Sequence, residues 1–139
     1  MATDHIRYRG GYKYQLVENY SIKVGITPDD DIKSEFINLS RDGELLIKRG
    51  YAWDGPSGPT IDTKDFMRGS LVHDALYQLM RDAGLPEDRW RATADLELKR
   101  CCLQDGMSQL RAWWVYRGVR LGGEPAASPE SRKKVYVAP

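Results

Sequence analysis

The first third of the chain alternates apolar and polar residues with the two-residue period of a half-buried β-strand. Short runs of this kind, rich in aromatic and β-branched residues, predict four strands. The predicted strands are residues 12–17, 20–24, 35–39 and 45–48. Gly43 is free to take a positive φ and therefore favours a hairpin turn before the last strand. We expect a small antiparallel β-meander within residues 10–50.

After Thr60 the apolar residues change to helical spacing. Gly84 ends the first predicted helix, Pro86 begins the second and Ser108 caps the third. The predicted helices are residues 63–82, 87–104 and 108–121. Because the connection between the first two is short, they should be antiparallel neighbours. Strands followed by helices, with no alternation, predict an α+β fold.

The segment 51–61 links the two parts. Its two prolines and two glycines argue against regular structure, yet Tyr51 and Trp53 are too apolar to be left in solvent. We therefore expect an ordered, packed loop. The chain is predicted to be one domain, residues 1–123, with a β part (10–50), this loop and the helices (62–122). Residues 124–139 are predicted to be a polar C-terminal tail.

Composition narrows the possible partners. With 21 basic and 20 acidic residues, the net charge is +1, so nucleic acid is not expected as a partner. No stretch approaches the ~18 apolar residues of a transmembrane helix, and the N-terminus has no secretory pattern. We expect synthesis in the cytoplasm. Cys101 and Cys102 are adjacent and predicted to be buried thiols, and Trp90, Trp113 and Trp114 are interpreted as core residues.

The candidate chemistry begins on the first predicted helix. His73 and Tyr77 are four residues apart and share one face. Gly69 and Ser70, one turn earlier, leave that face hollow for a ligand in this interpretation. Asp74 lies on the flank of the same helix.

Asp95 on the second predicted helix is the expected partner of His73 and Tyr77. It lies on an apolar stripe with Ala92, Leu98 and Cys102 and should be partly buried. A buried carboxylate needs donors, so we predict a His73 ring nitrogen at roughly 2.6–3.2 Å from Asp95. The carboxylate would fix the imidazole tautomer and leave the other nitrogen to take a proton from water.

A hard cation is the metal that fits this pattern. Asp74 and the carbonyls of a glycine-containing loop are oxygen ligands of the kind calcium prefers. A histidine-rich zinc site cannot be built, because the chain contains only His5 and His73. The same shortage excludes a phosphohydrolase of the HD type, which needs further metal-binding histidines.

Residues 50–121 resemble a family of small phage and prophage proteins of unknown function. The shared features are a loop at Asp54-Gly55-Pro56-Ser57, a helix with His73 to Tyr77, an Ala94-Asp95 helix and a Tyr116 to Arg120 helix. The resemblance implies a phage or prophage origin. It also implies a protein made in the host cytoplasm and incorporated in the virion.

Residues 51–105 are similar to the catalytic core of phospholipase A2, above all the disulfide-free form of parvovirus capsids and the bacterial form. The resemblance implies that His73 is the base, that Asp95 orients it and that Tyr77 supports Asp95. It implies a calcium site at Asp74, with Asp54 and Gly55 of the preceding loop. Prolines 56 and 59 and the glycine spacing of this loop depart from the family pattern.

Two functional hypotheses remain open, and they differ on whether the protein is an enzyme. One is a calcium-dependent esterase that hydrolyses phospholipid. The other is a non-catalytic virion structural or accessory protein, bound to other phage proteins, that keeps the helix pair as scaffold.

Overall fold

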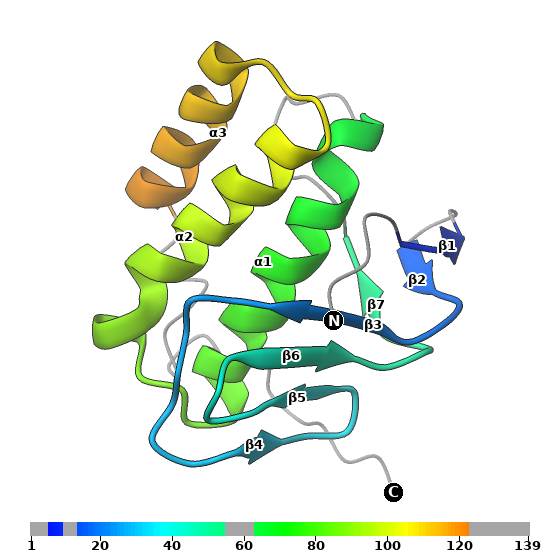
Figure 1. Ribbon diagram of the computed structural model, residues 1–139, viewed down its shortest axis with the longest axis vertical. Helices are drawn as coiled ribbons and strands as arrows, with labels where there is room; N and C mark the ends of the chain where they lie inside the picture. The colour runs from blue at the N-terminus through cyan, green and yellow to red at the C-terminus, as the bar shows by residue number, and fades with distance from the viewer. Residues whose placement is uncertain (1–5, 10–13, 55–62, 123–139) are drawn as a thin grey trace, which may run out of the picture.

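The computed structural model describes residues 6–9, 14–54 and 63–122 and has the predicted α+β architecture (Figure 1). Strands come first and three helices follow. The strands are β1 (Tyr8–Arg9), β2 (Tyr14–Leu16), β3 (Tyr20–Lys23), β4 (Ile32–Lys33), β5 (Ile37–Leu39), β6 (Glu44–Ile47) and β7 (Ala52–Trp53). The helices are α1 (Lys64–Asp82), α2 (Glu87–Gln104) and α3 (Gln109–Gly122).

A four-stranded antiparallel sheet has the order β3-β6-β5-β4. Ile22 pairs with Leu45, and Ile37 pairs with Ile47, so the buried side chains of neighbouring strands stand side by side. The predicted turn at Gly43 is confirmed: its φ is +88°, and a Cβ there would lie 2.5 Å from the carbonyl oxygen of Val24. Only glycine fits this turn without displacing the backbone.

The predicted antiparallel β part is confirmed, but it is divided between two sheets and is not a single meander. Among the described residues the strands form two sheets, and the second has the order β1-β2-β7. Tyr14 pairs with Trp53 across this second sheet, so part of the predicted loop is a strand. The physical reason is that the helix- and strand-breaking prolines begin only at residue 56, which leaves Ala52 and Trp53 free to pair.

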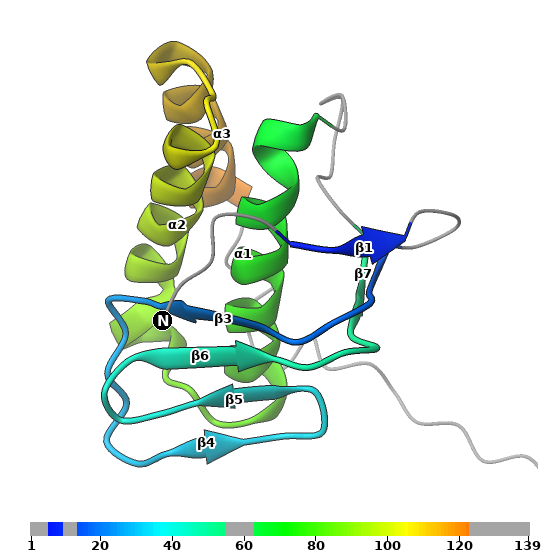
Figure 2. The same ribbon diagram turned by 45° about the vertical axis from the view of Figure 1, so that its right-hand side comes forward.

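The three helices match their predicted ranges. Gly84 and Gly106 follow α1 and α2 with φ of +81° and +98°, and Ser108 accepts a hydrogen bond from the backbone N–H of Arg111. α1 is the central element: it lies between α2 and the β1-β2-β7 sheet, and the four-stranded sheet lies across the lower part of both α1 and α2 (Figure 2). Most of its side chains are therefore buried.

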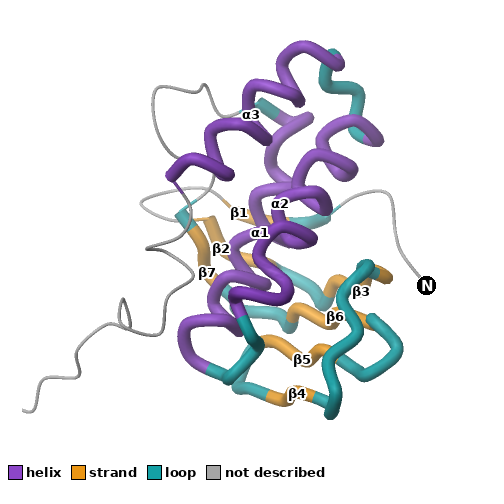
Figure 3. The backbone as a smooth tube through the Cα atoms, turned by 90° about the vertical axis from the view of Figure 1, so that its left-hand side faces the viewer, coloured by secondary structure: helices purple, strands orange, loops and turns teal. Residues whose placement is uncertain are grey.

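Polar contacts fasten the four-stranded sheet and the loop after β3 to the helices, and in one of them Arg100 Nη2 donates to the Lys23 carbonyl oxygen at 3.1 Å. Glu97 Oε1 accepts a hydrogen bond from the backbone N–H of Gly25 at 2.8 Å, and Arg68 Nη1 donates to the hydroxyl of Tyr20 at 2.9 Å. The sheet lies toward the end of the α1–α2 pair where the two helices are joined (Figure 3).

The interpretation of the tryptophans as core residues is wrong for two of them. Trp113 and Trp114 of α3 are 43% and 63% exposed, whereas Trp90 is partly buried against the core. Helical periodicity places an aromatic on a face but does not show whether another element covers that face. Within the described ranges no helix is both long and apolar enough to span a bilayer. The predicted tail, 124–139, lies outside them, so the division into one domain and a tail stays a prediction.

Candidate functional site: a histidine–aspartate pair between three helices

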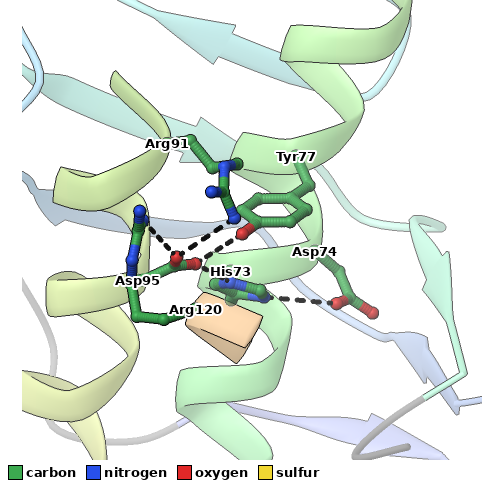
Figure 4. A network of polar contacts seen from close by, with 6 residues as sticks. All are labelled: His73, Asp74, Tyr77, Arg91, Asp95 and Arg120. Carbon is green, nitrogen blue, oxygen red and sulfur yellow. Dashed lines mark hydrogen bonds and ion pairs between the residues drawn. The ribbon is translucent and has the colours of Figure 1, made fainter. Parts of the chain in front are cut away.

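Asp95 lies at the centre of a buried polar network (Figure 4). His73 Nε2 lies 2.7 Å from Asp95 Oδ1, and the Tyr77 hydroxyl donates to the same oxygen at 2.5 Å. An ionised carboxylate only accepts hydrogen bonds, so His73 carries its proton on Nε2. The predicted contact between His73 and Asp95 is therefore confirmed, with Tyr77 beside it.

Two arginines complete the network, and sequence reasoning missed both. Arg120 of α3 donates from Nη1 to Asp95 Oδ2 at 2.8 Å. Arg91 lies one turn before Asp95 on α2, with Nη1 3.9 Å from the same oxygen. The four-residue spacing of Arg91 and Asp95 on one helix could have predicted their contact from the sequence. No such local pattern indicates Arg120, which is 25 residues from Asp95 and lies on another helix. Asp95 thus joins side chains from all three helices.

Helix packing sets the position of His73. A Cβ added to Gly69 would lie 3.0 Å from both Cys102 Sγ and the Leu98 side chain, so α2 approaches α1 closely one turn before His73. The hollow face predicted at Gly69 and Ser70 is therefore wrong: α2 packs against Gly69, and Ser70 accepts a hydrogen bond from Trp53 Nε1 at 3.0 Å. Gly69 therefore allows the close approach of α1 and α2.

The apolar stripe around Asp95 is only partly as predicted. Leu98 and Cys102 are buried, but Ala92 is exposed. The face of α2 that meets α1 is thus rotated from the one assumed. Burial raises the thiol pKa of Cys101 to about 11 and of Cys102 to about 12, as expected for unreactive core thiols.

The second ring nitrogen of His73 faces Asp74 (Figure 4). Nδ1 lies 3.9 Å from Asp74 Oδ1, which is longer than a hydrogen bond. The imidazole is 10% exposed and the Asp74 side chain 38% exposed, so this side of the ring adjoins a more open part of the site. His73 therefore has one nitrogen fixed by Asp95 and one directed toward a half-exposed carboxylate.

Burial and charge act in opposite directions on the pair. Burial lowers the pKa of His73, but the neighbouring carboxylates of Asp74 and Asp95 outweigh it, so the net shift is upward. Burial raises the pKa of Asp95, but hydrogen bonds from His73, Tyr77 and Arg120 outweigh it, so the net shift is downward. Asp95 is consequently ionised at neutral pH, as an orienting carboxylate must be.

The predicted calcium ligands are placed only in part. Asp74 lies beside His73, and Asp54 follows β7. The pKa of the Asp74 carboxyl is raised because the effect of burial outweighs the lowering effects of His73 and Arg81, and nearby Asp54 adds a smaller raising effect. Gly55 lies outside the described residues. In the ranges that the structure describes, no group of three or more His, Cys, Asp or Glu could hold a metal ion. The two carboxylates nonetheless supply oxygen donors of the kind that calcium takes together with backbone carbonyls.

No protein-family model matches this chain, and searches of curated proteins and of solved structures gave no significant match.

Proposed function

We propose that the protein is a calcium-dependent hydrolase of phospholipid esters in which His73 is the general base. The observation that carries the proposal is the hydrogen bond of 2.7 Å between His73 Nε2 and the buried carboxylate of Asp95, with Nδ1 directed to the other side. Resemblance of this helix pair to the phospholipase A2 core supplies the substrate class. Asp74 and Asp54, with Gly55, would hold the cation.

The chemistry of the chain's own residues is simple. Asp95 accepts a hydrogen bond from the Nε2–H of the neutral imidazole, which fixes the tautomer in which Nδ1 is unprotonated and basic. Nδ1 takes a proton from water as the water oxygen bonds to the ester carbonyl carbon. The resulting imidazolium, stabilised by Asp95, then returns the proton to the leaving alcohol oxygen as the ester C–O bond breaks. Fatty acid and lysophospholipid are the products, and the imidazole is regenerated.

Tyr77 and Arg120 act through Asp95 and not on the substrate. Both donate to it, one to each carboxylate oxygen, and so hold the carboxylate in position beside the His73 ring. Calcium, when bound, supplies positive charge for the phosphate and for the oxyanion that develops at the ester.

A second candidate function rests on a different property of the same network. Asp95 is fully buried and joins α1, α2 and α3 through His73, Tyr77 and Arg120. Such a network can have a purely structural role, in which it only holds the helices together. On this alternative the chain is a non-catalytic phage structural or accessory protein, incorporated in the virion and bound to other virion proteins.

Release of fatty acid from mixed phospholipid vesicles separates the two. The enzyme should release fatty acid with calcium and not with chelator, and Asp74→Asn should weaken the calcium dependence because the ligand loses its charge. Asp30→Asn is the matched control, since Asp30 is an exposed residue far along the chain from the site. A folded native protein that releases nothing above background with any head group would favour the structural alternative.

A further inference from the structure

The outward side of α3 is an exposed apolar stripe. Ala112, Val115 and Val119 pack against the cluster of buried residues between the helices. At 100° per residue, five other positions fall within one arc of about 100° on the opposite side of the helix. These residues, here called the outer face of α3, are Leu110, Trp113, Trp114, Arg117 and Leu121.

The exposure of the outer face is exceptional for this protein. Leu110 is 69% exposed, Trp113 43%, Trp114 63% and Leu121 80%. Leu103 of α2, 38% exposed, lines a groove with Leu110 and Trp113, and so extends the apolar surface. A contiguous patch of large apolar side chains usually marks an interaction surface.

The charges on α3 indicate what that surface meets. The helix carries no acidic residue, and of its three arginines Arg111 and Arg120 pair with Asp65 and Asp95, whereas Arg117 is exposed. Arg117 lies in the outer face itself, with its guanidinium carbon 5.6 Å from the centre of the Trp113 ring. Lys99 of α2 lines the same groove as Leu110. A second copy of the chain, docked face to face, would bring these cations together, whereas an anionic surface would neutralise them.

We propose that the outer face of α3 binds an anionic phospholipid bilayer, with the helix lying in the plane of the interface. Tryptophan prefers the headgroup level, leucine reaches the acyl boundary and arginine pairs with lipid phosphate. The residues of the outer face are not part of the network around His73 and Asp95, so the proposed membrane binding does not depend on catalysis. If the proposed function also holds, this face brings the protein to the surface that contains its substrate.

Vesicle flotation in the presence of chelator tests this binding without hydrolysis. The full chain should float with vesicles of phosphatidylcholine and phosphatidylglycerol and much less with phosphatidylcholine alone, and added salt should weaken the binding. The double variant Leu110→Ser/Trp114→Ala and the single variant Arg117→Glu should each lower the partition coefficient about tenfold or more. Arg41→Glu, at an exposed turn of the sheet, is the matched charge control and should change it less than twofold.

Three results would overturn the proposal. The first is equal binding to neutral and anionic vesicles, or to neither. The second is unchanged binding by the Leu110→Ser/Trp114→Ala variant with an intact circular dichroism spectrum. The third is a lipid-free protein that sedimentation shows to be a dimer dissociated by that same variant, because a second copy would then cover the face. Failure of fatty acid release with retained flotation would reject only the catalytic proposal.

Discussion

Arg120 of α3 and Asp95 of α2 form an ion pair of 2.8 Å in which the carboxylate is fully buried and the arginine is partly exposed. The same carboxylate holds His73 of α1. This single contact therefore couples the docking of α3 to the geometry of the candidate base. Side chains of α1 and α3 thus contact one charged group of α2, the Asp95 carboxylate.

Replacement of Arg120 by alanine should destabilise the fold. Asp95 keeps its bonds from His73 and Tyr77 but loses the donor to Oδ2, so we expect a loss of about 1–3 kcal/mol in the free energy of unfolding. Urea denaturation measures it. Arg117→Ala is the matched control on the same helix, because Arg117 is exposed and makes no contact with Asp95; it should change stability by less than about 0.5 kcal/mol. Equal losses for both variants would mean that the buried pair has no special role.

The Tyr77 hydroxyl should contribute to both stability and positioning. Tyr77→Phe keeps the ring but removes a donor to an ionised carboxylate, which costs about 1.5–3 kcal/mol. In an active enzyme the turnover number should fall more than the Michaelis constant changes, since Tyr77 positions Asp95 and does not bind substrate. A variant as stable and active as the native protein would show that the bond is not formed in solution.

Gly69 should tolerate no side chain. A Cβ would lie 3.0 Å from Cys102 Sγ and 3.2 Å from the backbone oxygen of Leu98, so α1 and α2 must separate. Overpacking of this kind costs about 1–3 kcal/mol, although alanine is the better helix former. Gly118→Ala on α3, where nothing lies within 4 Å of the added Cβ, is the control and should be neutral or stabilising. Thermal melting of both variants distinguishes crowding from helix propensity.

The free energy of unfolding should fall both at low pH, because of Asp95, and at high pH, because of His73. The pKa of Asp95 is lowered from its ordinary value of 3.8 in the fold, so its contribution is present above 3.8 and is lost as the pH falls through the lower folded value. The pKa of His73 is raised from 6.5, so its contribution is present below 6.5 and is lost as the pH rises through the higher folded value.

The His73–Asp95 pair should therefore contribute most between about pH 4 and 6.5. Unfolding free energies of the native protein and of His73→Gln, measured from pH 3 to 9, check this. The variant should lack the decline above pH 6.5. A decline of the same size in both proteins would assign it to other groups.

The sequence was sufficient for the parts of the site that depend on local spacing. His73 and Tyr77 share a face because they are four residues apart, and the short connection at Gly84 turns α2 back along α1. Asp95 follows from these two facts, because a carboxylate on the facing helix needs their donors.

Other features depend on packing that the sequence does not display. The pairing of Tyr14 with Trp53 spans 39 positions of the chain, and a period of two shows that strands exist but not which ones pair. Arg120 reaches Asp95 only because of how α3 docks, and that docking is set by Ala112 and the cluster around it. The apolar character of Trp114 likewise did not predict that its side chain is exposed.

The proposed hydrolase function depends on whether His73 is a general base. The direct measurement is the rate of fatty acid release from phospholipid vesicles at saturating calcium by the native protein and by folded His73→Gln. We predict a fall of about 10²–10⁴ in the variant, because glutamine fills the space beside Asp95 but cannot take the proton. Equal rates in the two proteins, or no release above background by the native protein, would contradict the account.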